Sequence, residues 1–96
     1  MKDIIFELID KTGRKIRLTK KQWSHMMKRH SYMEKYIEEI KETIKISDKI
    51  IYYNDKAYYY KHYKYLKAPN RFVLVIVKYL NSEGFIITSY LEKRIK

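Results

Sequence analysis

The chain has 96 residues, no cysteine, and 22 lysines and arginines against 11 acidic residues, which gives a formal net charge of +11. This length accommodates one hydrophobic core, so we expect a single domain over residues 1–96. The absence of cysteine excludes disulfides and thiolate metal sites, and the longest apolar run, Phe72–Val77, is too short to cross a bilayer.

The N-terminal residues predict a β-hairpin. Asp3–Ile9 alternates apolar and polar residues and carries acids, which is typical of a strand and not of a signal peptide. Lys11–Arg14 has the composition of a turn, with Gly13 tolerating a positive φ, and Lys15–Leu18 forms the return strand. Because the N-terminus is not typical of a signal peptide, no cysteine is present and no apolar run could cross a bilayer, we expect a cytoplasmic protein with no membrane partner.

Two capping signals predict two helices. Thr19 followed by Gln22, and Ser31 followed by Glu34, each have the spacing of a capping box. The first helix then covers Thr19–His30 and the second begins at Ser31. The side of the first helix that we expect to pack on the sheet consists of Trp23, Met26, Met27 and His30.

The second half of the chain predicts strands. After a helix that ends at Ser47-Asp48, the period changes to two, and strands are expected at Lys49–Tyr53, Ala57–Leu66, Phe72–Leu80 and Phe85–Leu91. Phe72–Leu80 is apolar on both faces, as in a central strand that is covered on both sides. The expected fold is α+β, in the order ββααββββ, with an N-terminal hairpin and two helices packed on one face of a four-stranded antiparallel sheet.

Tyrosines and lysines are concentrated on the long expected strand. Most of the 11 tyrosines lie between Tyr52 and Tyr65, and no acidic residue occurs from Lys56 to Ser82. Exposed tyrosines beside lysines can stack on RNA bases, although β-propensity and core packing explain tyrosines equally well. Both faces carry both residue types, so the exposed face stays open. The candidate RNA-binding residues are Tyr58, Tyr60, Lys61, His62 and Lys64.

Two histidines lie on the first expected helix. His25 and His30 are five residues apart, which is about 140° around a helix, so they do not share a face. His25 pairs with Arg29 four residues later. A structural interpretation makes His30 a partly buried core residue and His25 a surface residue. A helical zinc pair needs i,i+4 spacing, and a phosphate-binding glycine loop needs more than the two glycines present, so we expect neither metal nor cofactor.

Three segments together resemble a known family. They are Thr19–His30 (T-x-x-x-W-x-H-M-x-x-x-H), the helix end at Thr43–Ile50, and the closing strand Phe85–Tyr90. The chain resembles phage-associated nuclease domains of the barnase/EndoU/colicin/RelE-like (BECR) superfamily, although Ser31-Tyr32 stands where these domains usually have Pro-Glu.

The resemblance implies a metal-independent endoribonuclease, toxin-like or encoded by a mobile element, that cleaves RNA by attack of the 2′-OH. It implies His30 and His25 as proton-transfer residues and a cation that stabilises the phosphate, for which Arg71, at the start of a strand in the acid-free segment, is the candidate. It also implies Thr88 and Tyr90 as contacts to the scissile phosphate.

Two alternatives stay open. The chain can be a catalytically inactive RNA-binding domain, or a protein-interaction module whose tyrosines and positive charge meet an acidic partner such as an antitoxin or immunity protein.

Overall fold

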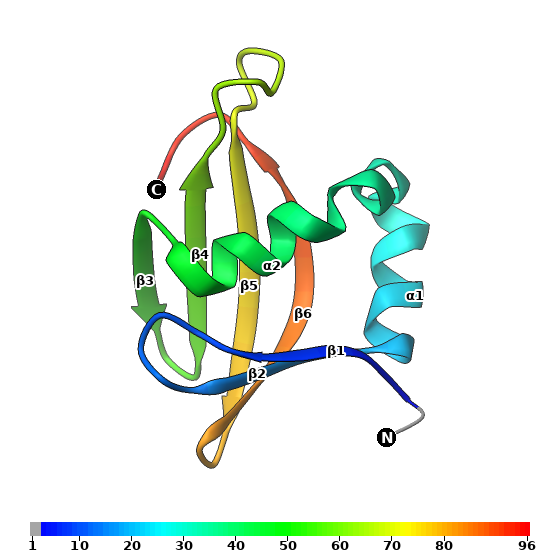
Figure 1. Cartoon of the computed structure of the whole chain (residues 1–96), viewed down its shortest axis with the longest axis vertical. Helices are drawn as coiled ribbons and strands as arrows, with labels where there is room; N and C mark the ends of the chain where they lie inside the picture. The colour runs from blue at the N-terminus through cyan, green and yellow to red at the C-terminus, as the bar shows by residue number, and fades with distance from the viewer. Residues whose placement is uncertain (1–2) are drawn as a thin grey trace.

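Six strands form one mixed sheet, and two α-helices and a 3-10 helix connect its second strand to its third (Figure 1). The computed structural model describes residues 3–96, so the first two residues of the expected domain lie outside it. The elements are β1 (Ile4–Ile9), β2 (Lys15–Thr19), α1 (Lys20–Arg29), the 3-10 helix η1 (Ser31–Tyr36), α2 (Ile37–Ile46), β3 (Lys49–Tyr53), β4 (Lys56–His62), β5 (Phe72–Leu80) and β6 (Glu83–Glu92). The α+β class is confirmed. Within residues 3–96, neither α-helix is long and apolar enough to cross a membrane.

The N-terminal hairpin is part of the main sheet. The strand order is β1-β2-β6-β5-β4-β3, and neighbours are antiparallel except β2 and β6, which are parallel. The expected four-stranded antiparallel sheet with a separate hairpin was therefore wrong. After β2 the chain passes through the helices and then through β3, β4 and β5 before β6, which runs parallel to β2 and hydrogen-bonds to its second edge.

Gly84 allows β2 and β6 to approach each other. It lies opposite Ile16 in the parallel register and is buried. A Cβ atom on Gly84 would lie 2.5 Å from Ile16 Cδ1 and 2.8 Å from Val77 Cγ1. The missing side chain therefore makes room for core residues on both neighbouring strands.

The first helix begins as expected and the second does not. Thr19 Oγ1 accepts a hydrogen bond from the Gln22 N–H at 3.2 Å, so the first N-cap is confirmed. The second helix was expected from Ser31, but residues 31–36 form η1 and α2 begins at Ile37. The His30 carbonyl accepts from the Met33 N–H at 2.9 Å, and this i,i+3 bond begins a 3-10 turn in place of a capped α-turn.

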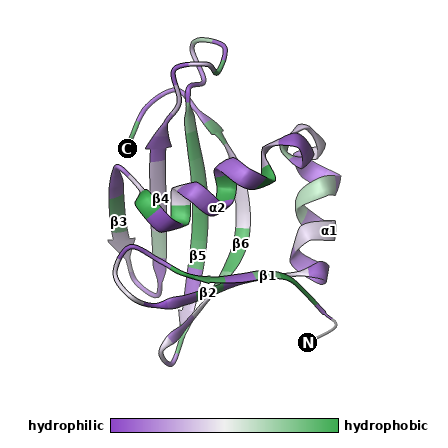
Figure 2. Cartoon of the chain, in the orientation of Figure 1, coloured by the Kyte–Doolittle hydropathy of each residue, from purple (hydrophilic) through white to green (hydrophobic). Residues whose placement is uncertain are grey.

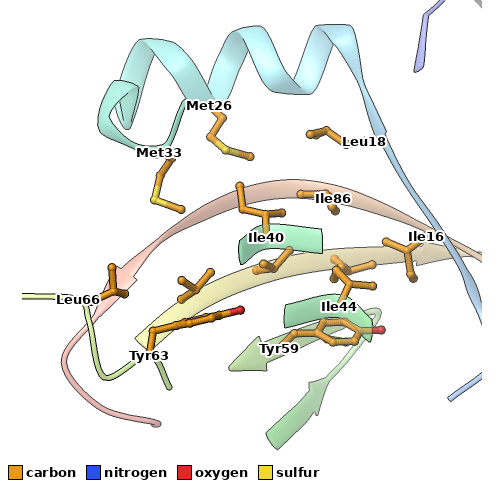
Figure 3. Close-up of a cluster of buried hydrophobic side chains, with 14 residues drawn as sticks. Ile16, Leu18, Met26, Met33, Ile40, Ile44, Tyr59, Tyr63, Leu66 and Ile86 are labelled. Atoms are coloured by element: carbon orange, nitrogen blue, oxygen red, sulfur yellow. The ribbon is translucent and has the colours of Figure 1, made fainter. Parts of the chain in front are cut away.

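The main core lies between the helices and one face of the sheet (Figure 3). Met26 and Met33 reach it from α1 and η1, and Ile40 and Ile44 reach it from α2, which crosses β4 and β5 in Figure 1. All four side chains are at most 1% exposed. Trp23 is half-buried and packs against this core, as its helix position predicted.

A second, smaller cluster covers the other face of the sheet. Tyr60, Leu74 and Ile76 are buried there, so β5 is covered on both faces, in agreement with its apolar sequence (Figure 2). The residues packed around them are Ile51, Tyr58, Phe72, Ile87, Tyr90 and Ile95.

Strand β4 is shorter than expected. It ends at His62, whereas the alternating pattern predicted a strand to Leu66. Tyr63 and Leu66 turn into the helix-side core, and the Tyr63 hydroxyl donates to Glu42 Oε1 at 2.7 Å. Burial of these two side chains stabilises a turn, in which the Leu66 N–H donates to the Tyr63 carbonyl, over continued strand pairing.

Asp10 is a buried carboxylate that connects the N-terminal hairpin to β4. It is 5% exposed, and its Oδ1 accepts hydrogen bonds from the Thr12 and Arg14 N–H groups, each at 2.8 Å. Its Oδ2 accepts from the hydroxyl of Tyr59, which also contacts the hydroxyl of Tyr79. Burial by itself would raise the pKa of Asp10, but these hydrogen bonds outweigh it and lower the pKa below 3.8.

This carboxylate should make the unfolding free energy depend on pH in the acidic range. Because the pKa of Asp10 is lower in the folded state, its stabilisation is present above the unfolded pKa and is lost as pH falls through the folded pKa. We expect Asp10→Asn to lower the unfolding free energy by about 2 kcal/mol at neutral pH. In urea titrations the difference from wild type should shrink below about pH 4. The exposed Asp3→Asn is the control, and a pH-independent difference for Asp10→Asn would contradict this account.

Candidate functional site

A groove of about 400 Å³ lies between α1 and the second half of β6. Figure 1 shows α1 standing beside β6 on the side away from β5. The groove is lined by Gln22, His25, Met26, Arg29, His30, Ile76, Ile87, Thr88 and Tyr90. Four of the five residues that the family resemblance implied for catalysis are therefore brought together in one place.

Helix α1 supplies one wall through a single stripe of side chains. Gln22, His25, Met26 and Arg29 follow i, i+3, i+4, i+7 spacing, so they lie along the same side of the helix. Met26 is buried and anchors the stripe in the core, whereas His25 and Arg29 are exposed. The helix therefore presents an imidazole and a guanidinium to the groove, one turn apart.

His30 lies at the C-terminal cap of α1, where its N–H still donates to the Met26 carbonyl at 2.7 Å. The 140° separation inferred from the sequence assumed helical geometry through His30, but this residue is the C-cap of α1, with φ −136° and ψ 57°. This backbone conformation places His30 in the lining of the same groove as His25. The two histidines therefore line one groove although about 140° separates them on an ideal helix.

The His30 ring is positioned by aromatic neighbours. It is half-buried, and its centroid lies 5.1 Å from that of Tyr90 with an interplanar angle of 33°. Tyr32 approaches it edge-on at 5.9 Å. No hydrogen bond from the His30 imidazole to another side chain or to the backbone occurs within residues 3–96. Its ring nitrogens are therefore available to a ligand in the groove.

Strand β6 supplies the opposite wall, next to a β-bulge. Thr88 pairs with Ile76, but Ile86 pairs with Val77, so Ile87 is an extra residue in β6. Bulges redirect the side chains around them, and here both Ile87 and Thr88 line the groove. Tyr90 follows on the same face as Thr88, as predicted from strand alternation.

The groove favours negatively charged ligands. Arg29 provides a permanent positive charge, and no lining residue in the described part of the chain is acidic. The Tyr90 phenol is protonated at neutral pH even at its ordinary pKa, so it can donate a hydrogen bond, and burial, assisted by the negative charge of Glu92, raises that pKa further. No cluster of metal-binding side chains is found within residues 3–96.

Arg71, the remaining candidate, lies outside the groove. Its Nε donates to the Leu66 carbonyl at 3.0 Å and so holds the loop between β4 and β5. Arg29 lines the groove with the two histidines, and it supplies there the positive charge that we expected from Arg71. The i,i+4 relation of Arg29 to His25 was visible in the sequence, but it was interpreted only as a surface pair.

The candidate RNA-binding residues do not form one platform. Tyr60 is 2% exposed and Tyr58 is half-buried, so the larger part of these rings is covered. His62 is exposed at the end of β4, with its ring against Phe72. Lys61 points to the opposite face, where its Nζ lies over the Tyr63 ring, and Lys64 lies in the loop beyond β4.

The Tyr90 hydroxyl should be dispensable for folding. It makes no hydrogen bond within the described residues 3–96, so we expect Tyr90→Phe to change the unfolding free energy by less than about 0.5 kcal/mol. The matched control is Tyr59→Phe, which removes a buried partner of Asp10 and should cost about 1–3 kcal/mol. Equal losses in chemical denaturation would show that the Tyr90 hydroxyl supports the fold and does not face a ligand.

Comparisons with protein-family models, with curated proteins and with solved structures found no match to this chain.

Proposed function

We propose that this protein is a metal-independent endoribonuclease that cleaves RNA through attack of a 2′-OH on the adjacent phosphate. One observation carries the proposal: His25, His30 and Arg29 line the same groove as Thr88 and Tyr90, with no acidic residue among its described lining. Two imidazoles and a cation are the groups that this reaction needs, and they are gathered from a helix, its cap and a distant strand.

The two histidines supply both proton transfers. One neutral imidazole removes the proton from the 2′-OH, and the resulting oxygen attacks phosphorus. The other, protonated imidazole donates a proton to the leaving 5′-oxygen as the P–O5′ bond breaks. The products are a 2′,3′-cyclic phosphate and a 5′-hydroxyl, and the two histidines end with exchanged protonation states.

Arg29, Thr88 and Tyr90 stabilise the phosphate during the reaction. The guanidinium can donate two parallel hydrogen bonds to phosphate oxygens, which carry more charge in the transition state than in the substrate. The Thr88 hydroxyl and the protonated Tyr90 phenol add donors from the opposite wall. Because side chains supply the acid, the base and the positive charge, the proposed mechanism requires no metal ion.

The proposed substrate is single-stranded RNA. Tyr32 is 45% exposed beside His30, so a base flanking the cleaved bond can stack on its ring. The net charge of +11 attracts RNA from a distance, and it would equally suit an acidic neutralising protein if the enzyme acts as a toxin.

His30→Ala should abolish most of the cleavage. We expect single-turnover cleavage of a short RNA in EDTA to fall by roughly 10²–10⁴-fold, because one proton transfer is lost. The melting temperature should change little, since the half-buried imidazole makes no hydrogen bond within residues 3–96. The control is His62→Ala, which removes the histidine outside the groove and should leave the rate at saturating RNA unchanged. A large loss of stability with a normal rate per folded molecule would contradict the assignment of His30.

The two arginines should differ in their effect on cleavage. Arg29→Gln should lower kcat/KM by about 10- to 100-fold, which corresponds to about 1.5–3 kcal/mol for hydrogen bonds from a charged group. Arg71→Gln removes the same charge from an arginine whose Nε is bonded to the Leu66 carbonyl, and it should have a much smaller effect. The comparison is made on one RNA at one salt concentration. Equal losses would mean that overall charge, and not the groove, determines the rate.

A further inference from the structure

A second groove, of about 470 Å³, lies where three hairpin turns meet. It is bordered by the turns β1–β2, β3–β4 and β5–β6, and it shares no lining residue with the groove at α1. In Figure 1 these turns lie at the lower left, whereas the end of α1 that carries His30 lies at the upper right. The nuclease mechanism makes no use of this region.

Arg14 is held in this groove by two aromatic rings. Its guanidinium carbon lies 4.5 Å from the ring centroid of Tyr79 and 5.7 Å from that of Tyr52. No ion pair of Arg14 occurs within residues 3–96. These cation–π contacts restrict the guanidinium, and its N–H groups that are not bonded to the Tyr79 hydroxyl can bind an anion. Such preorganisation lowers the entropy cost of binding.

The charge balance of the groove is positive. Lys56 is half-buried in its lining and makes no ion pair within the described residues. Asp55 also lines the groove, but it faces the Nζ of Lys78 at 3.7 Å, so its charge is already compensated. Arg14 and Lys56 are therefore two cations without acidic partners, which suits the charge of a phosphate monoester.

The remaining lining residues suit a planar base. Asn54 and Asn81 occupy the left-handed region, with φ of 56° and 61°, which places one carboxamide in each of two tight turns. A carboxamide can bond adenine through one donor and one acceptor. Tyr52 is 52% exposed and offers a ring on which the base can stack.

We propose that this groove binds a nucleotide, with the phosphate on Arg14 and Lys56 and the base on Tyr52 between the two asparagines. The site is independent of the groove at α1. It binds a mononucleotide or the terminal nucleotide of a strand, because these ligands present the same phosphate, sugar and base.

The test measures binding of three probes to the full chain by calorimetry: AMP, ribose 5-phosphate and inorganic phosphate. We expect AMP to bind more tightly than the other two, because only AMP fills both parts of the groove. Arg14→Gln and Lys56→Gln should each weaken AMP about tenfold, equivalent to about 1.4 kcal/mol. Tyr52→Leu should remove the advantage of AMP over ribose 5-phosphate.

The matched control is Lys28→Gln, which removes one positive charge from an exposed residue on α1 that lines neither groove. It should leave AMP binding unchanged. If Arg14→Gln fails to fold, Lys56→Gln and Tyr52→Leu decide the question. The proposal is overturned if AMP does not bind, if it binds no more tightly than ribose 5-phosphate, or if Lys28→Gln weakens it as much as Lys56→Gln.

Discussion

The short parallel pairing of β2 with β6 determines where the candidate active site can form. The two strands pair only from Lys15 to Arg17 against Glu83 to Phe85, so the rest of this edge of β6 has no neighbouring strand. Helix α1 follows directly from β2 and lies beside that free part of β6. The stripe that carries His25 and Arg29 thereby faces Thr88 and Tyr90 across a groove.

Several contacts fix this pairing. Gly84 lets the core side chain of Ile16 lie against it, and Arg17 forms ion pairs with Glu7 on β1 at 2.8 Å and with Glu83 on β6 at 3.0 Å. At the other end of the hairpin, Asp10 is tied to β4 through Tyr59, and the Lys11 amine donates to the Ser47 carbonyl at 2.8 Å. The hairpin is thus held at both ends. The groove at α1 and the groove at the three turns depend on the same attachment.

Local patterns predicted most elements, because these depend on residues close in sequence. Thr19 caps α1, and the alternating strands lie close to their expected ranges. The attachment of the hairpin could not be predicted this way, because the pairing of Ile16 with Gly84 joins residues far apart in the chain. The hydrogen bond of Asp10 with Tyr59 also joins residues far apart in the chain, so local patterns did not predict it. Likewise, the residues around His62 do not by themselves predict the end of β4. The strand ends there because Leu66 is buried against the helices.

The site was predicted better by residue type than by geometry. Both histidines, Thr88 and Tyr90 line the groove, although ideal helical spacing separated His25 from His30. His30 is the C-cap of α1, and its own backbone angles lie outside the α region. Arg71 was chosen for its place in an acid-free segment, which describes charge along the chain and not in space. Arg29 lines the groove with the histidines because it lies on α1, between His25 and the C-cap His30.

The chemistry of the cleaved ends tests the central claim most directly. RNA incubated with the protein in EDTA should yield fragments that end in a 2′,3′-cyclic phosphate and begin with a 5′-hydroxyl, as measured by mass spectrometry. A strand with deoxyribose on the 5′ side of the cleaved phosphate should remain intact there, because it lacks the attacking hydroxyl. Fragments with 5′-phosphates, cleavage of the deoxyribose strand, or RNA that stays intact would contradict the account.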